Sequence, residues 1–364
     1  MLRYYRDAFI FTGICLALAG WLGFAQTGTA AGTLGVLWIV LVLGVLEISL
    51  SFDNAIVNAA VLRGMAPVWR RRFLLWGIVI AVFGMRLVFP LAIVAIAAHV
   101  GPVDAVKLAA TDPATYQRII TGAHTGIAGF GGAFLAMVGL TFFLNEEKEV
   151  HWISFLERPL GALAKVSGLA LAAVLLALYG ISRLLPIGEA MTYLTAGIFG
   201  LIAFVAVDAL GDVIGGETEV EGREATADQA VEAVAKAGLG AFLYLEMLDA
   251  SFSFDGVIGA FALSNNLFVI ALGLGIGAMF VRSMTVMLVE RGTLAEYAFL
   301  EHGAFYAILA LAGIMLVSAR YEVPDTITGL VGAGLIALAF WSSVRHEDDT
   351  IEPVAPTGER LTIR

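Results

Sequence analysis

Long apolar runs separated by short polar stretches follow one another along almost the whole chain. Each run is close to the ~20 residues that an α-helix needs to cross a bilayer. The runs are continuous and do not alternate, which favours membrane helices over a β-barrel. The pattern therefore predicts an all-α polytopic membrane protein with about ten transmembrane helices, at residues 8–25, 34–62, 73–98, 122–144, 161–183, 189–210, 239–263, 266–289, 298–318 and 324–344.

The polar residues between the runs predict the orientation of the chain. Arg63 and Arg70–Arg72 crowd the loop after the second run, and Arg3 and Arg6 precede the first run. The loop between the first two runs has no charged residue. Because Lys and Arg gather on the cytoplasmic side of a membrane, we expect the N-terminus in the cytoplasm. An even number of spans returns the C-terminus to the same side.

The second apolar run carries polar residues at the depth of the bilayer. Its residues 47–54 read Glu-Ile-Ser-Leu-Ser-Phe-Asp-Asn, although an acid at a helix centre costs roughly 2.5–3.5 kcal/mol. Residues 249–256 read Asp-Ala-Ser-Phe-Ser-Phe-Asp-Gly and align with them without a gap. The next runs match too, since 77–86 aligns with 273–282 from a glycine to an arginine. The orientation makes this an inverted duplication of about five spans per half.

The duplicated segments supply only oxygen donors. Carboxylate, hydroxyl and amide oxygens suit Mn²⁺, Mg²⁺ or Ca²⁺ better than copper or zinc. Inverted duplication brings the two segments face to face near the midplane, which predicts a single divalent cation site there. Its candidate ligands are Glu47, Ser51, Asp53, Asn54, Asp249, Ser253 and Asp255.

Four further residues are expected to support these ligands. Arg86 and Arg282 lie in the runs that follow the two segments and offset surplus negative charge. Glu246 precedes Asp249 by one turn and is a candidate supporting acid. His124 opens the fourth run and is a weaker candidate, because a histidine at a helix end is more often interfacial. In the alternative interpretation, the acids only pair with the arginines or cap half-helices.

The spacing within residues 47–54 favours a broken helix. Glu47 and Asp53 are six residues apart, roughly 240° around an ideal helix, so they do not share a face. The helix is either packed on both sides or broken between Ser51 and Asn54. We favour the break, because Asp and Asn are weak helix formers and broken helices recur at transporter sites.

Local composition divides the chain into four parts. We expect a first membrane half at 1–210 that includes the start of the second repeat, and an acidic cytoplasmic linker at 211–238. The remaining membrane spans occupy 239–344, and 345–364 form a disordered cytoplasmic tail. The linker prediction rests on its excess of Asp and Glu, since charge-rich segments rarely bury a core.

The overall composition excludes several classes of protein. The chain has 364 residues, of which 60% are hydrophobic, a net charge of −10 and a mean hydropathy of +0.90, and we expect no nucleic-acid partner. Cys15 is the single cysteine, which excludes a disulfide framework and a thiolate metal cluster. The sequence has no GxxxxGK[ST] segment of an ATP-driven pump. Ser51 and Ser253 lack a neighbouring histidine, so we expect no enzyme.

The duplicated segments resemble the TerC family of integral membrane proteins. The family motif reads acid-x-x-Leu-Ser-x-Asp-Asn, which residues 47–54 match. The second family motif has an acid and then Phe-x-x-Asp-Ser, a region where Asp249 and Phe254-Asp255 stand here. Gly256 replaces the family's Ser, and the Ile-Pro that follows it is absent. The resemblance covers mainly the second, third, seventh and eighth runs, and it implies a divergent branch.

This resemblance implies a function, which the residues alone do not. TerC proteins belong with the LysE-type transporters, and their implied role is the export of divalent cations, chiefly Mn²⁺, with a historical link to tellurite resistance. For this chain it implies metal ion exchange across a bacterial inner membrane, with the metal ion and the bilayer as partners and a homo-oligomer left open. The alternative is a non-transporting membrane scaffold, or an assembly or stress-response factor, with a structural metal or ion pair.

Overall fold

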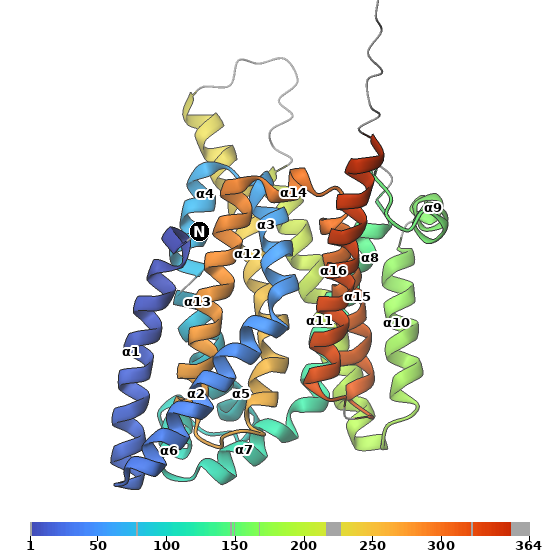
Figure 1. The fold of residues 1–364 in the computed structure, drawn as a ribbon. Helices are drawn as coiled ribbons and strands as arrows, with labels where there is room; N and C mark the ends of the chain where they lie inside the picture. Colours follow the sequence, from blue (N-terminus) through green and yellow to red (C-terminus); the bar gives the residue numbers. More distant parts are fainter. Residues whose placement is uncertain are drawn as a thin grey trace, which may run out of the picture.

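The computed structural model describes residues 2–350 apart from 78, 146, 147, 149, 167, 216–226 and 322. Every element in these ranges is helical, which confirms the all-α fold (Figure 1). The elements are α1 (Leu2–Thr27), α2 (Ala30–Leu50), α3 (Phe52–Gly64), α4 (Pro67–Arg72), η1 (Phe73–Gly77), η2 (Ile80–Val88), α5 (Phe89–Ala97), α6 (Pro102–Thr111), α7 (Pro113–Gly122), α8 (His124–Phe143), α9 (Ser154–Leu163), α10 (Leu169–Ser182), α11 (Ile187–Gly215), α12 (Ala227–Ala260), α13 (Leu267–Arg291), α14 (Thr293–Glu296), α15 (Leu300–Ser318) and α16 (Asp325–Thr350).

Within the described ranges, eight helical segments are long and apolar enough to cross a membrane, so the chain is a polytopic membrane protein. They are α1, α2, η2 with α5, α8, α11, α13, α15 and α16. The two other predicted spans also fall on helices. α10 has only 14 residues, fewer than the ~20 that cross a bilayer unaided. α12 is long enough, but acidic residues in its central turns make it less apolar.

The helices that carry residues 47–54 and 249–256 run in opposite directions (Figure 1), as the sequence predicted. α2 and α3 run from the lower end of the bundle to its upper end, whereas α12 runs downward (Figure 1). The N-terminus, α4 and the end of α16 lie at the same upper end, while α6 and α7 lie at the lower end (Figure 1). An even number of crossings accounts for this placement of the two ends of the described chain.

Contacts between helices follow part of the expected twofold relation. α2 packs on α13 and α12 packs on η2, as an exchange of the two halves requires. The same exchange relates the α3–α15 contact to the α12–α8 contact. The outer helices depart from it, since α1 packs on α13 while α11 packs on α8. A full superposition of the halves therefore stays a prediction.

Glycines on α13 allow α2 to approach it closely. A Cβ at Gly273 would lie 2.6 Å from the Leu43 Cβ, and a Cβ at Gly277 would lie 2.3 Å from the Glu47 Cβ. Both distances are shorter than any real Cβ contact, so only glycine fits at these positions. Small residues commonly permit such contacts between membrane helices. The close contact fixes Glu47 against the centre of α13.

The third span begins in π-helical geometry rather than as a regular α-helix. The π-helical stretches are η1 and η2, and Arg86 lies in the second of them. A π turn holds one residue more than an α turn, and such turns are frequent at functional sites. The span becomes an ordinary helix in α5, which has Pro90 in its first turn. The geometry of η2 therefore sets the direction of the Arg86 side chain.

Candidate ion site at the helix break

The helix of the first motif breaks at Ser51, as the sequence predicted. Ser51 has φ −104° and ψ 20°, with α2 ending before it and α3 starting after it. Its hydroxyl donates to Oε1 of Glu47 at 3.2 Å, and Asp53 Oδ1 accepts the backbone N–H of Asn54 at 2.9 Å. Such local side-chain bonds compete with regular helix geometry. The second motif behaves differently, since α12 runs through residues 249–256 without a break.

Glu47 forms an ion pair with Arg86 inside the bundle. A guanidinium nitrogen of Arg86 donates to Glu47 Oε1, and the side chains of Arg86 and Glu47 are only 5% and 3% exposed respectively. A second nitrogen of Arg86 donates to the carbonyl of Ala81, five residues earlier in η2. The Nε of Arg86 is buried and has no acceptor among the described residues. Two nitrogens of Arg86 therefore donate hydrogen bonds, whereas the third has no acceptor among the described residues.

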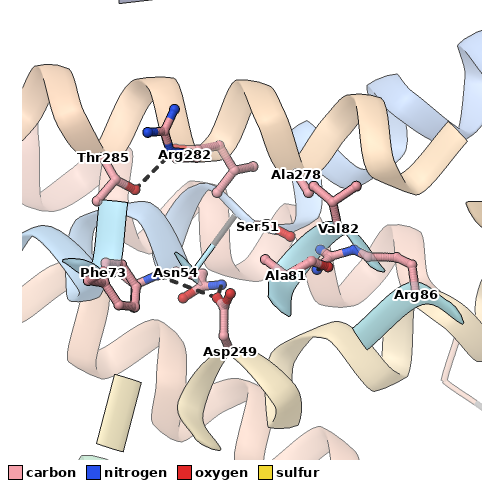
Figure 2. Close-up of a pocket in the computed structure, with 13 residues that line it drawn as sticks. Ser51, Asn54, Phe73, Ala81, Val82, Arg86, Asp249, Ala278, Arg282 and Thr285 are labelled. Carbon is pink, nitrogen blue, oxygen red and sulfur yellow. Dashed lines mark hydrogen bonds between the residues drawn. The ribbon is translucent and has the colours of Figure 1, made fainter. Parts of the chain in front are cut away.

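Asp249 of the second motif meets two amides of the first. The side-chain amide of Asn54 donates to Asp249 Oδ1, and the amide of Asn58 lies 3.4 Å from the same oxygen. Figure 2 shows Asn54 from α3 and Asp249 from α12 pointing toward one another. The Oδ1 atoms of both asparagines are buried without a donor among the described residues. They remain as two unused oxygen ligands beside a carboxylate.

Two small cavities lie beside the break, and Ser51 lines both. The first has a volume of about 40 Å³ and the second about 30 Å³. A water needs roughly 10–15 Å³ by this measure, so each cavity has room for about two to four water-sized species, such as an ion with one or more waters. The polar and charged residues of the first are Ser51, Asn54, Asn58, Arg86, Asp249, Arg282 and Thr285. Those of the second are Glu47, Ser49, Ser51, Asp53 and Thr328.

Glycines make room around the acids of the second cavity. A Cβ at Gly256 would lie 3.2 Å from Oε2 of Glu47, and a Cβ at Gly332 on α16 would lie 3.6 Å from Oδ2 of Asp53. Asp53 is buried, and its Oδ1 accepts the backbone N–H of Asn54. The absence of a side chain at Gly256 therefore leaves space beside Oε2 of Glu47 at the second cavity.

The predicted ligands are divided between the two cavities. Glu47 and Asp53 face the second cavity and Asp249 the first, and no three acidic, histidine or cysteine side chains converge on one point within the described part. The Asp255 side chain lies outside the described residues, although its backbone belongs to α12. Ser253 is buried, and its hydroxyl has no partner in the described structure.

The supporting residues take different positions. Arg86 and Arg282 both line the first cavity. Glu246 is buried, and neither of its carboxylate oxygens has a hydrogen-bond partner among the described residues. It faces η1, where a Cβ at Gly77 would lie 3.1 Å from Glu246 Oε1. His124 lies elsewhere, at the start of α8, with its Nε2 3.5 Å from the hydroxyl of Ser318.

A second buried polar cluster was missed by the sequence analysis. Glu157 of α9 binds Lys148 at 2.9 Å, the Tyr306 hydroxyl at 3.1 Å and the backbone N–H of Ile153 at 3.1 Å, and His302 lies 3.5 Å away. Burial raises the pKa of Glu157, but the Ile153 N–H and the Lys148 ammonium outweigh it, and the net pKa falls below its usual value. Lys148, Ile153 and Glu157 are near one another in the sequence, but Tyr306 lies 149 residues beyond Glu157. None of these residues lies in a repeated motif.

Together, these features define a polytopic helical membrane protein with a buried polar site at a broken helix. Residues 52–350 match the family described as "Protein of unknown function (DUF475)", and the chain belongs to that family. The match begins at the first residue of α3 and ends at the last residue of α16. No curated protein and no solved structure is significantly similar to the chain.

Proposed function

We propose that this protein is a secondary transporter that exports a divalent metal cation from the cytoplasm. The observation that carries the proposal is the pair of oxygen-lined cavities at the Ser51 break, within a bundle of membrane helices. Buried acids inside membrane segments are costly and mark ion pathways by default. Broken helices at such sites release backbone groups for ion binding.

The donor chemistry narrows the substrate. Carboxylates and hydroxyls line the second cavity. A carboxylate, amides and hydroxyls line the first together with the guanidinium groups of Arg86 and Arg282, and the lining residues described include no histidine or cysteine. Oxygen-only sites suit Mn²⁺, Mg²⁺ and Ca²⁺. The resemblance of residues 47–54 to the TerC motif favours Mn²⁺ among the three. It also favours a bacterial inner membrane. The arginine distribution and the even number of spans favour both termini in the cytoplasm.

The two cavities suggest how an ion is handled. An ion in the second cavity is bound by Glu47 and Asp53, with Ser51 beside it. An ion in the first is bound by Asp249 with the Oδ1 atoms of Asn54 and Asn58, which accept no hydrogen bond from the described residues. Ser51 borders both cavities and links the two positions. We infer that the ion passes the helix break in two steps, with no covalent chemistry and no enzyme activity.

Metal flux in proteoliposomes tests the proposal. The purified chain is expected to carry Mn²⁺ across the membrane to an enclosed fluorescent indicator. Asp53→Asn keeps the side-chain shape, removes the charge and is expected to reduce the flux at least about tenfold, since a divalent ion loses a charged ligand. Glu189→Gln, at an exposed acid near the start of α11, is the matched control and should leave flux unchanged. Absence of flux in the unaltered chain would overturn the proposal.

The alternative is a membrane scaffold that holds no transported ion. It is favoured by the internal pairing of Glu47 with Arg86 and of Asp249 with Asn54, because these contacts satisfy two of the acids without a metal. Buried ion pairs of this kind can serve structural specificity alone. In that case Asp53→Asn would leave Mn²⁺ movement at the level of protein-free vesicles, and the unaltered chain would show the same level.

A further inference from the structure

The Glu47–Arg86 pair stands between the two cavities. Arg86 lines the first cavity and does not line the second, whereas Glu47 lines the second and not the first. The ion pair therefore joins one wall of each cavity across the bundle. Ser51 touches both cavities and donates its hydroxyl to the same Glu47 oxygen that Arg86 binds. An ion that moves from one cavity to the other has to pass this group of three side chains.

A divalent cation and the Arg86 guanidinium compete for Glu47. Both need the carboxylate as a partner, and the guanidinium already holds Oε1. Two positive groups on one buried carboxylate repel strongly, because the surrounding protein screens charge far less than water does. Binding of the cation at Glu47 therefore favours release of the arginine, and return of the arginine favours release of the cation.

The surroundings of Arg86 give the released guanidinium a place to go. One nitrogen already donates to the Ala81 carbonyl, and Nε has no acceptor within the described part of the chain, so the described residues do not supply a full set of partners. Asp249 lines the same cavity as Arg86 and offers a second carboxylate. Figure 2 shows Arg86 on η2 and Asp249 on α12 at the same cavity. Asp249 is the one carboxylate among the described residues that line this cavity, so it is the available partner for the guanidinium once it leaves Glu47.

We propose that Arg86 is a tethered cation that competes with the transported metal for Glu47, so that one guanidinium both displaces the ion and closes the passage between the two cavities. This inference rests on the proposed transport function, and it names Arg86 as the residue that couples ion binding to the opening of the passage between the two cavities. It predicts opposite effects of one substitution on binding and on turnover. A merely structural arginine would affect both in the same direction, or neither.

The test compares Mn²⁺ affinity, by calorimetry on the whole chain in nanodiscs, with Mn²⁺ flux in proteoliposomes. Arg86→Gln removes the competing charge and is expected to tighten Mn²⁺ binding about tenfold, equivalent to one unit in log Kd, while turnover falls. Arg282→Gln is the matched control, because it removes a positive charge from the same cavity and leaves the Arg86–Glu47 pair in place. It should change the affinity much less.

A chemical rescue separates competition from a general loss of structure. In Arg86→Ala, millimolar guanidinium ion is expected to weaken Mn²⁺ binding and to restore turnover, whereas the unaltered chain should not respond. If Arg86→Gln does not assemble, Arg86→Lys keeps a charge with fewer fixed donors, and we expect it to tighten binding by a smaller factor. Monodisperse elution from a sizing column verifies assembly of each variant.

The outcomes distinguish this inference from the transport proposal. If the unaltered chain neither binds nor carries Mn²⁺, the proposed function is wrong and the role of Arg86 falls with it. If the unaltered chain carries Mn²⁺ but Arg86→Gln binds it equally or more weakly, only the tethered-cation inference is wrong. Tighter binding with slower turnover, reversed by guanidinium ion in Arg86→Ala, supports both.

Discussion

Asn54 and Asp249 are 195 residues apart in the chain, yet the amide of one donates to the carboxylate of the other between α3 and α12. The contact joins the two copies of the duplicated segment through residues that do not correspond in the alignment, since Asn54 aligns with Gly256. The halves of the chain are thus held together at the site itself.

This contact is expected to contribute to stability as well as to the site. Asn54→Ala removes a donor to a partly buried carboxylate, and we expect a loss of about 1–3 kcal/mol in the free energy of unfolding. A double-mutant cycle with Asp249→Asn isolates the contact itself. Thermal unfolding in detergent measures each variant. A coupling energy near zero would show that the two side chains act independently.

The close approach of α2 and α13 is expected to tolerate no added methyl group at Gly277. A Cβ there would lie 2.3 Å from the Glu47 Cβ, so Gly277→Ala should destabilise the protein by about 1–3 kcal/mol and displace Glu47. Gly313→Ala on α15 is the matched control, since nothing lies within 4 Å of a Cβ at that position. The control should be neutral or slightly stabilising, because Ala favours a helix. Equal melting temperatures for the two variants would contradict the prediction.

The unpartnered carboxyl group of Glu246 is expected to cost stability. Its two oxygens are buried without a hydrogen-bond partner among the described residues, and such groups cost about 1–3 kcal/mol. Glu246→Met keeps a side chain of similar length and should raise the unfolding temperature. Glu189→Met changes an exposed acid and should have little effect on it. A lower unfolding temperature in Glu246→Met would mean that the carboxyl group makes a favourable contact.

The cluster around Glu157 predicts a pH dependence of stability. The folded-state pKa of this carboxyl group lies below its ordinary value, so its charged form is favoured by folding. It therefore stabilises the protein above the unfolded pKa of about 4.3, and this contribution is lost as the pH falls through the lower folded pKa. When the pH is lowered from about 5 to about 3, the unfolding temperature of Glu157→Gln is expected to fall less than that of the unaltered chain. Parallel curves would contradict a role for this ionisation.

The helix break and the antiparallel motif helices could be predicted because their signals are local. Glu47 and Asp53 cannot share one face of an unbroken helix, and the break at Ser51 places them on two short helices. The arginines near the start of α1, at the end of α3 and in α4 predicted the side on which the chain begins. The order of the spans then predicted opposite directions for α3 and α12, which the ribbon shows (Figure 1). The sequence also led us to propose that the acids were part of a buried site.

The division of that site into two cavities could not be predicted from the sequence. An ideal twofold arrangement places the acids around one point, but the packing of α2 on α13 directs Glu47 toward Arg86 instead. The unbroken α12 was also unforeseen, because the Asp-Gly pair at residues 255–256, near its C-terminal end, is a weak helix former. The Glu157 cluster depends on contacts between α9 and α15 that leave no periodic signal in the chain. Tertiary packing decided each of these features.

Because η2 is π-helical, the direction of the Arg86 side chain depends on how many residues η2 contains. A π turn accommodates one extra residue, and one residue corresponds to roughly 100° of rotation in an α-helix. If the extra residue were lost from η2, every side chain beyond it would rotate by about that angle. Arg86 would then no longer face Glu47, although no residue at the site had changed. The number of residues in η2 thus decides which face of the third span contacts residues 47–54.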